Sequence, residues 1–197
     1  FTMKLVKGKT LAQLLAEGEK LEGGRTRLLQ IFEQVCQTMA YAHSRGVIHR
    51  DLKPANIMVG AFGEVQVMDW GLAKILGDEP EPLPVDPGTP PTVVQIVQPD
   101  SGEETPKTQD GMALGTPSYM PPEQALGELD NVDARADVFA LGSILCEILT
   151  GQPVYPRASL KQNLKEALRG RTEDAAPRLE SSGADAVSYT HLTLPTT

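Results

Sequence analysis

The sequence predicts an α+β fold that is mainly helical and contains one small β-hairpin. Two long stretches, 25–44 and 136–150, carry apolar residues at the spacing of a buried helix face. Between them, the apolar runs 57–59 and 65–68 flank a glycine-containing loop, which is typical of a hairpin. The chain has 197 residues, about the length of one domain, and shows no internal repeat.

The first half of the chain predicts two helices. Residues 1–7 resemble the end of a strand, and Thr10 is placed to cap a short helix over 11–16. The helix over 25–44 has the clearest apolar stripe: Leu28, Ile31, Phe32, Val35, Cys36, Met39 and Ala42. Gly46 stands where a C-terminal cap belongs.

The second half predicts a deeply buried helix and an amphipathic one. The stretch 136–150 is apolar on most of its circumference, so we expect it at the centre of the fold. Gly151 follows it and is suited to end it. A last amphipathic helix is predicted over 159–168.

Composition excludes several classes of protein. The net charge of −8 argues against a general nucleic-acid or anionic-membrane binder, because both need a basic surface. No apolar run is long enough to cross a bilayer, and the two cysteines, Cys36 and Cys146, lie in helical patterns typical of buried, reduced thiols. We therefore expect a cytoplasmic protein. The chain begins at Phe1 without an initiator methionine, so we expect it to be part of a longer protein.

Two segments differ from the rest. Residues 78–110 hold eight of the 16 prolines, and eight acidic residues against a single lysine, which predicts a disordered loop. Residues 187–197 are rich in threonine and lack Asp, Glu, Lys and Arg. They are interpreted as a tail foreign to the fold, such as read-through of a cloning adapter, with a genuine strand as the alternative.

The block His49-Arg50-Asp51-Leu52-Lys53-Pro54-Ala55-Asn56 carries the chemistry, together with Asp69-Trp70-Gly71, which begins thirteen residues later. Asp51 can orient a hydroxyl and accept its proton, and Lys53 can offset charge on a transferring phosphate. Asn56 and Asp69 offer the hard oxygen ligands that Mg²⁺ prefers, and the predicted hairpin would bring them together. A lone Asp or Asn in a loop is usually a turn cap, but that reading does not explain the whole array.

These two motifs resemble the catalytic loop and the metal-binding triplet of protein kinases, with Trp70 in place of the usual Phe. The lysine two positions after Asp51 is the serine/threonine form. Residues 115–123 resemble the end of an activation segment, and residues 133–142 resemble the start of the central helix. The chain thus resembles a Hanks-type serine/threonine protein kinase of bacterial style, with a partial kinase domain over 1–186 that corresponds to the large, helical lobe.

The resemblance implies ATP and Mg²⁺, with Mn²⁺ as a substitute, and protein substrates that carry Ser or Thr; it implies no nucleic acid. It implies nucleotide contacts from Lys4 and Val6 through their backbones and from Met58 beneath the adenine, besides the metal ligands Asn56 and Asp69. His49 would pack internally and bond to backbone. No motif supports His43 or His191, so each is interpreted as an ordinary surface or core residue.

Four further residues are given regulatory or structural roles by the resemblance. Arg50 would pair with a phosphate on the activation loop, for which Ser101, Thr105, Thr108 and Thr116 are the candidate acceptors. Thr116 is favoured instead for a structural contact with Asp51 and Lys53. Glu123 would pair with an arginine that the chain does not reach. Asp137 would tie the central helix to the backbone of the catalytic loop.

The Gly-rich loop and the ATP-clamping lysine of kinases do not occur in the sequence, so we expect the small lobe to be absent and the chain alone to have little activity. Three functions stay open. The first is the catalytic lobe of an active kinase, whose parent protein could carry a membrane anchor elsewhere. The second is a non-catalytic pseudokinase or scaffold, which the intact Asp51, Asn56 and Asp69 argue against. The third is a small-molecule phosphotransferase.

Overall fold

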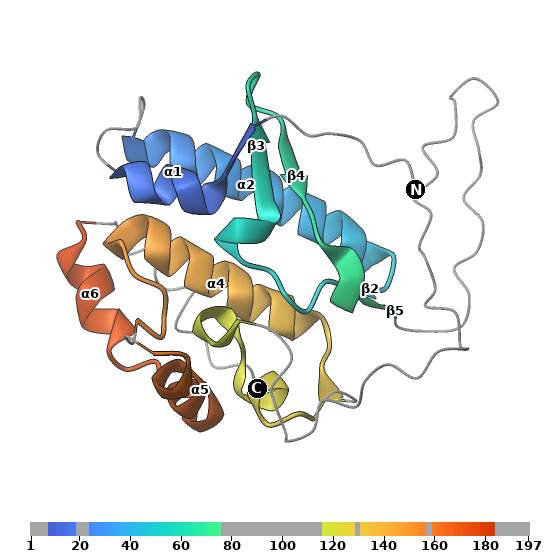
Figure 1. Ribbon diagram of the computed structural model, residues 1–197, viewed down its shortest axis with the longest axis vertical. Coiled ribbons are helices and arrows are strands. Elements are labelled where there is room, and N and C mark those ends of the chain that lie inside the picture. Colours follow the sequence, from blue (N-terminus) through green and yellow to red (C-terminus); the bar gives the residue numbers. More distant parts are fainter. Residues whose placement is uncertain (1–7, 19–23, 76–115, 129–130, 157–158, 184–197) are drawn as a thin grey trace.

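The computed structural model describes residues 8–18, 24–75, 116–128, 131–156 and 159–183 (Figure 1). Within them the fold is mainly helical, as predicted, and it includes the expected hairpin. The predicted strand end at 1–7, the proline-rich stretch 78–110 and the tail 187–197 lie outside the described residues.

Six α-helices and a few short strands make up the described chain. The helices are α1 (Leu11–Glu17), α2 (Gly24–Ser44), α3 (Pro122–Ala125), α4 (Ala134–Thr150), α5 (Leu160–Arg169) and α6 (Ala175–Ser181). The helices expected at 11–16, 25–44, 136–150 and 159–168 are therefore confirmed, with ends that differ by at most two residues. α6 was not predicted. Within the part that the structure describes, no helix is long and apolar enough to cross a membrane.

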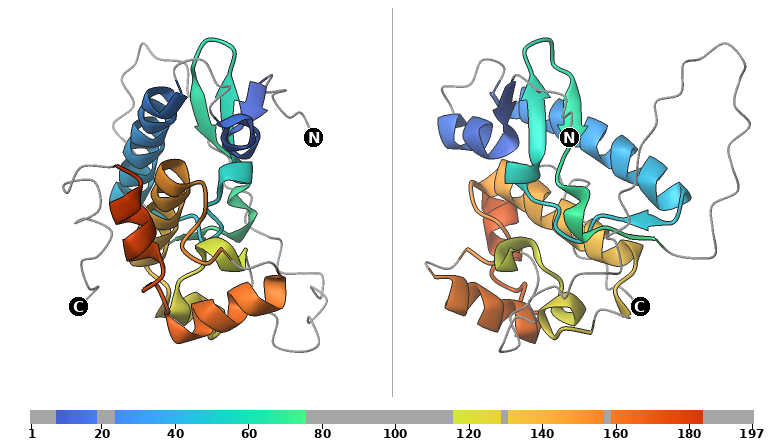
Figure 2. Two further views of the ribbon diagram at one scale, coloured as in Figure 1. Left: turned by 90° about the vertical axis from the view of Figure 1, so that its left-hand side faces the viewer. Right: turned by 45° about the vertical axis from the view of Figure 1, so that its right-hand side comes forward.

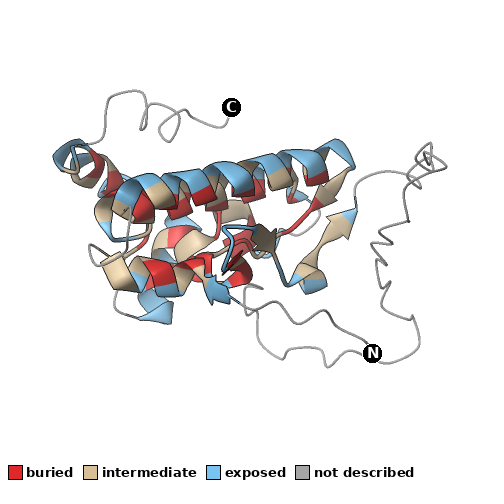
Figure 3. Ribbon diagram, turned by 90° about the horizontal axis from the view of Figure 1, so that it is seen from above, coloured by how far each residue is buried: buried red, intermediate tan, exposed pale blue. Residues whose placement is uncertain are grey.

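The two long helices, α2 and α4, pack against each other at the centre of the molecule (Figures 1 and 2). Exposed residues follow the outer side of α2 and buried residues follow the side that faces the protein, as the periodicity predicts (Figure 3). The main core combines residues from both helices with residues from α1, the catalytic block and the hairpin: Leu11, Leu14, Leu28, Ile31, Val35, Met39, Leu52, Ile57, Val59, Ala140, Ile144 and Ile148.

Capping residues fix the ends of these helices. Thr10 caps α1 through a reciprocal pair, because its Oγ1 accepts from the N–H of Gln13 and the Gln13 side chain accepts from the N–H of Thr10. Asp133 caps α4 by accepting from the N–H of Arg135 at 2.8 Å. Gly151 ends α4 at φ 77°, and its N–H donates to the Glu147 carbonyl.

The predicted hairpin is part of a three-stranded antiparallel sheet. Strands β3 (Ile57–Gly60) and β4 (Val65–Val67) form the predicted hairpin, and β1 (Gly8–Thr10) pairs with the free edge of β3. The registers are Gly8 with Gly60, and Ile57 with Val67. A second, two-stranded sheet joins β2 (Val47–Ile48) to β5 (Lys74–Ile75), which lie on either side of the candidate site residues 49–71 in sequence.

A second core lies below α4, between α4, α5 and α6: Met120, Ala125, Cys146, Leu149, Val154, Tyr155, Ala167, Ala175 and Leu179. Cys146 is buried here, whereas Cys36 on α2 is only partly buried, so the prediction of two buried thiols was wrong for Cys36. Both are free thiols, and burial raises the pKa of each.

Candidate active site

The block 49–56 follows β2 and ends in a short 3₁₀ turn, η2 (Pro54–Asn56), that leads into β3. Pro54 stands at the start of this turn, where its missing N–H leaves no hydrogen bond unmade. Lys53 Nζ lies 2.6 Å from Asp51 Oδ2. Asn56 Nδ2 donates to the Asp51 carbonyl at 2.9 Å and to Asp51 Oδ2 at 3.3 Å. Three of the predicted site residues therefore form one hydrogen-bonded group.

The hairpin brings the fourth residue, Asp69, to the same end of the sheet. The Met68 N–H donates to the Asn56 carbonyl at 2.8 Å, so the residue before Asp69 is directly bonded to the residue that precedes β3. Asp69 has φ 62° and ψ 60° and precedes the 3₁₀ turn η3 (Trp70–Leu72). This left-handed conformation is uncommon for a residue with a side chain, although Asp tolerates it better than most.

The donor set fits a hard divalent cation. Among the described residues, neither the Asp69 carboxylate nor Asn56 Oδ1 accepts a hydrogen bond, and Asp69 is exposed. The described part of the chain holds no group of three or more His, Cys, Asp or Glu side chains that could hold a metal. Mg²⁺ needs no such group, because it is commonly held by one or two protein oxygens together with substrate phosphates and water.

A single buried carboxylate holds the start of the block 49–56 against α4. Asp137 is 1% exposed, and it accepts from the N–H of His49 at 2.8 Å and from the N–H of Arg50 at 2.9 Å. His43, in the last turn of α2, contacts the same carboxylate at 2.8 Å. The interpretation of His43 as an ordinary residue missed this contact, since its partner lies far away in the sequence and leaves no local motif.

His49 connects the block 49–56 to the triplet 69–71. Its ring is fully buried, and Nε2 lies 2.9 Å from the Met68 carbonyl, so Nε2 carries the proton. Its Nδ1 can then accept from the N–H of Asp51, 3.3 Å away. The His49 ring also contacts the Trp70 ring, with centroids 4.7 Å apart. The expected internal packing and backbone bonding of His49 are confirmed.

Arg50 adds a second connection between the two loops. Its Nε donates to the Leu72 carbonyl at 2.5 Å, and partial burial lowers the pKa of its guanidinium. Its own carbonyl accepts from Gln124 Nε2 at 2.6 Å. Like Asp69, Arg50 has a positive φ, 65°. The candidate phosphate acceptors Ser101, Thr105 and Thr108 lie outside the described residues.

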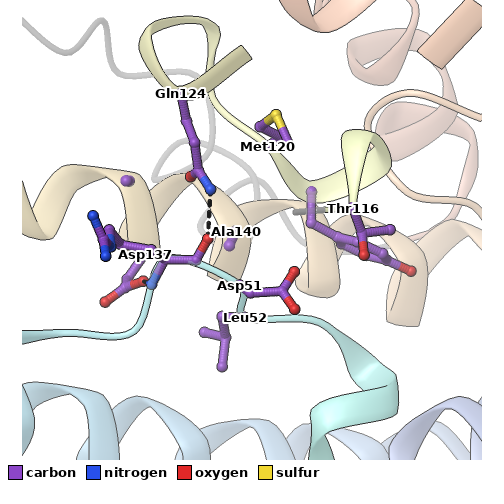
Figure 4. Close-up of a pocket in the computed structure, with 10 residues that line it drawn as sticks. Asp51, Leu52, Thr116, Met120, Gln124, Asp137 and Ala140 are labelled. Carbon is purple, nitrogen blue, oxygen red and sulfur yellow. Dashed lines mark hydrogen bonds between the residues drawn. The ribbon is translucent and has the colours of Figure 1, made fainter. Parts of the chain in front are cut away.

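A small pocket of about 10 Å³, room for about one water, opens beside the candidate base. Figure 4 shows Asp51 and Thr116 lining it, with Gln124 bonded to the loop below. Thr116 precedes the 3₁₀ turn η4 (Pro117–Tyr119), and the described residues include no hydrogen bond from its side chain to Asp51 or Lys53. Thr116 is thus near Asp51 but not bonded to it.

The turn η4 is held by side chains of α4 and α5. Tyr119 Oη donates to Glu147 Oε2 at 2.7 Å, and burial with this bond raises the pKa of Tyr119. The Ser118 carbonyl accepts from Ser143 Oγ at 2.9 Å, and Ser118 Oγ accepts from Asn163 at 2.6 Å. The sequence analysis missed these supports, because single polar residues on helices carry no pattern.

The remaining candidate residues are placed as follows. Met58 lies in β3 and is partly buried, opposite Gln66. Glu123 is in the first turn of α3 and forms no ion pair with any described residue. Lys4 and Val6 lie outside the described residues.

Comparison with known proteins identifies the family of this chain. Residues 1–192 match the model of the protein kinase domain family, so the chain belongs to that family. Its bacterial relatives are named serine/threonine-protein kinases, which makes it a member of the Hanks type. The predicted family and the kinase-like fold are confirmed.

Two relatives define the similarity more closely. The chain is 36% identical over 193 residues to serine/threonine-protein kinase PknD of Protochlamydia amoebophila, with 91% of this chain and 18% of the relative covered. It is 37% identical over 155 residues to PknB of Mycobacterium tuberculosis, covering 78% of this chain and 20% of the relative. The chain therefore spans about a fifth of the length of these relatives.

A solved structure shows the same fold. A chain in the crystal structure of the yeast RNA Pol II CTD kinase CTDK-1 complex superposes with a TM-score of 0.56 at 19% identity. The match covers 82% of this chain and 43% of that chain. At this identity the likeness concerns the fold alone.

Proposed function

We propose that this chain is the large catalytic lobe of a serine/threonine protein kinase, which transfers the γ-phosphoryl group of ATP to hydroxyl groups of proteins. The observation that carries the proposal is the hydrogen-bonded group of Asp51, Lys53 and Asn56, joined through the Met68 backbone to Asp69. A base, a cation and two oxygen ligands in one place suit phosphoryl transfer, which depends on positioning and charge stabilisation.

Asp51 has the role of base. Its carboxylate is 9% exposed and is fixed by Lys53 and Asn56, so it can face a substrate hydroxyl in one orientation. It would orient that hydroxyl and accept its proton as the new P–O bond forms. Lys53 would place its positive charge near the transferring group once the substrate competes for Asp51.

Asn56 and Asp69 would hold Mg²⁺, with Mn²⁺ as a substitute. When bound, the metal would supply positive charge that offsets the negative charge of the ATP phosphates. Both residues keep oxygen atoms that no described residue occupies, which supports the assignment. The nucleotide roles of Lys4, Val6 and Met58 are part of the same proposal, as is the division into a domain over 1–186 and a foreign tail.

The regulatory roles follow from the same resemblance. Arg50 would bind a phosphate of the activation loop, although its Nε is bonded to the Leu72 carbonyl, so only its two terminal nitrogens are available for that contact. Glu123 would pair with an arginine in the parent protein. Asp137 and its three hydrogen bonds would set the position of the catalytic loop.

The test is phosphoryl transfer from radiolabelled ATP to a generic protein substrate by the full-length protein. Asp51→Asn should lower the rate by about 10²- to 10⁴-fold, whereas Asp133→Asn, a change at a partly exposed cap of α4, should leave it unchanged. Retained activity in Asp51→Asn would contradict the proposal. An inactive wild type would favour a pseudokinase, and transfer to small molecules alone would favour the third function.

A second variant tests the metal assignment. Asp69→Ala removes one proposed ligand, so metal-dependent use of the nucleotide should be lost, and added Mg²⁺ should not restore it. If this variant keeps the wild-type rate at low Mg²⁺, the assignment of Asp69 is wrong even if Asp51 is the base.

A further inference from the structure

The metal triplet differs from its usual form at Trp70, and the difference adds a hydrogen bond. The indole Nε1 of Trp70 donates to the Val67 carbonyl at 3.0 Å. Val67 is the last residue of β4, so this hydrogen bond links the residues on either side of Met68 and Asp69, the second of which is the proposed metal ligand. A phenylalanine at this position has no donor and cannot form it.

Asp69 is a residue that needs such support. It is one of two non-glycine residues with positive φ in the described part of the chain. A left-handed backbone costs about 1–2 kcal/mol for a residue with a Cβ, so the surrounding contacts must hold it in place. The Asp69 side chain is exposed and accepts no hydrogen bond from a described residue. The contacts that hold its backbone conformation must therefore come from neighbouring residues.

Both residues before Asp69 are held by side chains from outside the hairpin ladder. The Val67 carbonyl accepts from Trp70, and the Met68 carbonyl accepts from His49. The His49 and Trp70 rings are in contact at 4.7 Å, so the two bonds support each other. His49 is fully buried, and its backbone N–H donates to Asp137 of α4. The residues before Asp69 are therefore connected to α4 through His49.

We propose that Trp70 is a positioning residue whose indole N–H holds Asp69 in the conformation that binds the metal. This inference rests on the proposed function, because it takes Asp69 as a metal ligand. The indole N–H itself, and not only the size of the ring, is needed to hold Asp69 for metal binding. Without the donor, the Met68–Asp69 segment would leave the left-handed conformation part of the time, and metal would bind to a smaller fraction of molecules.

The hydrogen bond can be tested without any assay of activity. Trp70 is the only tryptophan in these 197 residues, and in the ¹⁵N-labelled full-length protein its indole N–H signal is the one that Trp70→Phe removes. We expect this proton to exchange with solvent at least about tenfold more slowly than that of a free indole. Exchange at the free rate would overturn the proposal, because the bond would then not persist in solution.

The consequence for metal binding is tested with Trp70→Phe in the full-length protein. Loss of one hydrogen bond should raise the Mg²⁺ concentration for half-maximal activity by about three- to tenfold, with the KM for the protein substrate unchanged. Tyr41→Phe is the matched control, since Tyr41 is 61% exposed and remote from the triplet in sequence, and it should change neither value. A loss of packing alone would lower the melting temperature without changing the metal requirement.

Two further arms keep the outcomes separate. If Trp70→Phe does not fold, the Trp70 analogue in which sulfur replaces the indole N–H keeps the ring shape and should show the same rise. If Asp69→Ala loses its metal-dependent activity but Trp70→Phe behaves as wild type, the role proposed for Trp70 is wrong and the proposed function stands. If Asp69→Ala keeps the metal-dependent activity of the wild type, Asp69 is not a metal ligand.

Discussion

Replacing Asp137 should destabilise the protein more than any surface change on the same helix. In Asp137→Ala, the N–H groups of His49 and Arg50 lose their acceptor in a site that is 1% exposed. A buried donor left without a partner costs about 1–3 kcal/mol. With two such donors and the contact to His43, we expect a loss of about 3–5 kcal/mol in the free energy of unfolding.

The measurement is urea denaturation followed by far-ultraviolet circular dichroism at neutral pH. The matched control is Asp133→Ala, because Asp133 lies four residues earlier, is partly exposed, caps α4 and pairs with the exposed Arg135. Its loss should be about 1 kcal/mol. If the two variants lose equal stability, the three bonds to Asp137 do not anchor the loop, and the reasoning from burial is wrong.

Two smaller effects concern α4. Burial raises the pKa of Glu147, with the Tyr119 bond acting in the opposite direction, so the folded state binds the proton more tightly than the unfolded chain. The stability that Glu147 provides is therefore complete below its ordinary pKa of 4.5 and declines as pH rises through the raised value. The urea midpoints of wild type and Glu147→Gln should diverge over that pH range. Parallel pH profiles of the two proteins would contradict this prediction. Gly151→Ala should cost about 1 kcal/mol, because φ is 77° and no atom lies within 4 Å of the added Cβ; an unchanged urea midpoint would show that the helix end adapts.

The long helices and the hairpin could be predicted because their signals are periodic and local. The stripe of α2 and the apolar surface of α4 are set by residues three and four apart, and Gly151 ends α4 as expected. The ligand spacing between Asn56 and Asp69 could likewise be read from the sequence, since a hairpin aligns its two ends.

The contacts that the sequence did not predict are those formed between distant segments. His43 and Asp137 are 94 residues apart, and no local pattern joins them. β1 is only three residues long and lacks alternation, so it can be recognised only once β3 is present to pair with it. α6 has seven residues with Pro177 among them, which gives too short a periodic signal.

The pairing of β1 with β3 also limits how the hairpin can move. β3 is bonded on both edges, by Gly8–Thr10 on one side and by Val65–Val67 on the other. Gly8 lies so close to β3 that an added Cβ would lie 2.2 Å from the Val59 carbonyl, so only glycine fits. A strand that is fixed on both sides cannot slip by one residue without breaking both ladders. The relative position of Asn56 and Asp69 is therefore fixed in the protein without a ligand. A substitution of the distant Gly8 should shift these two residues relative to each other.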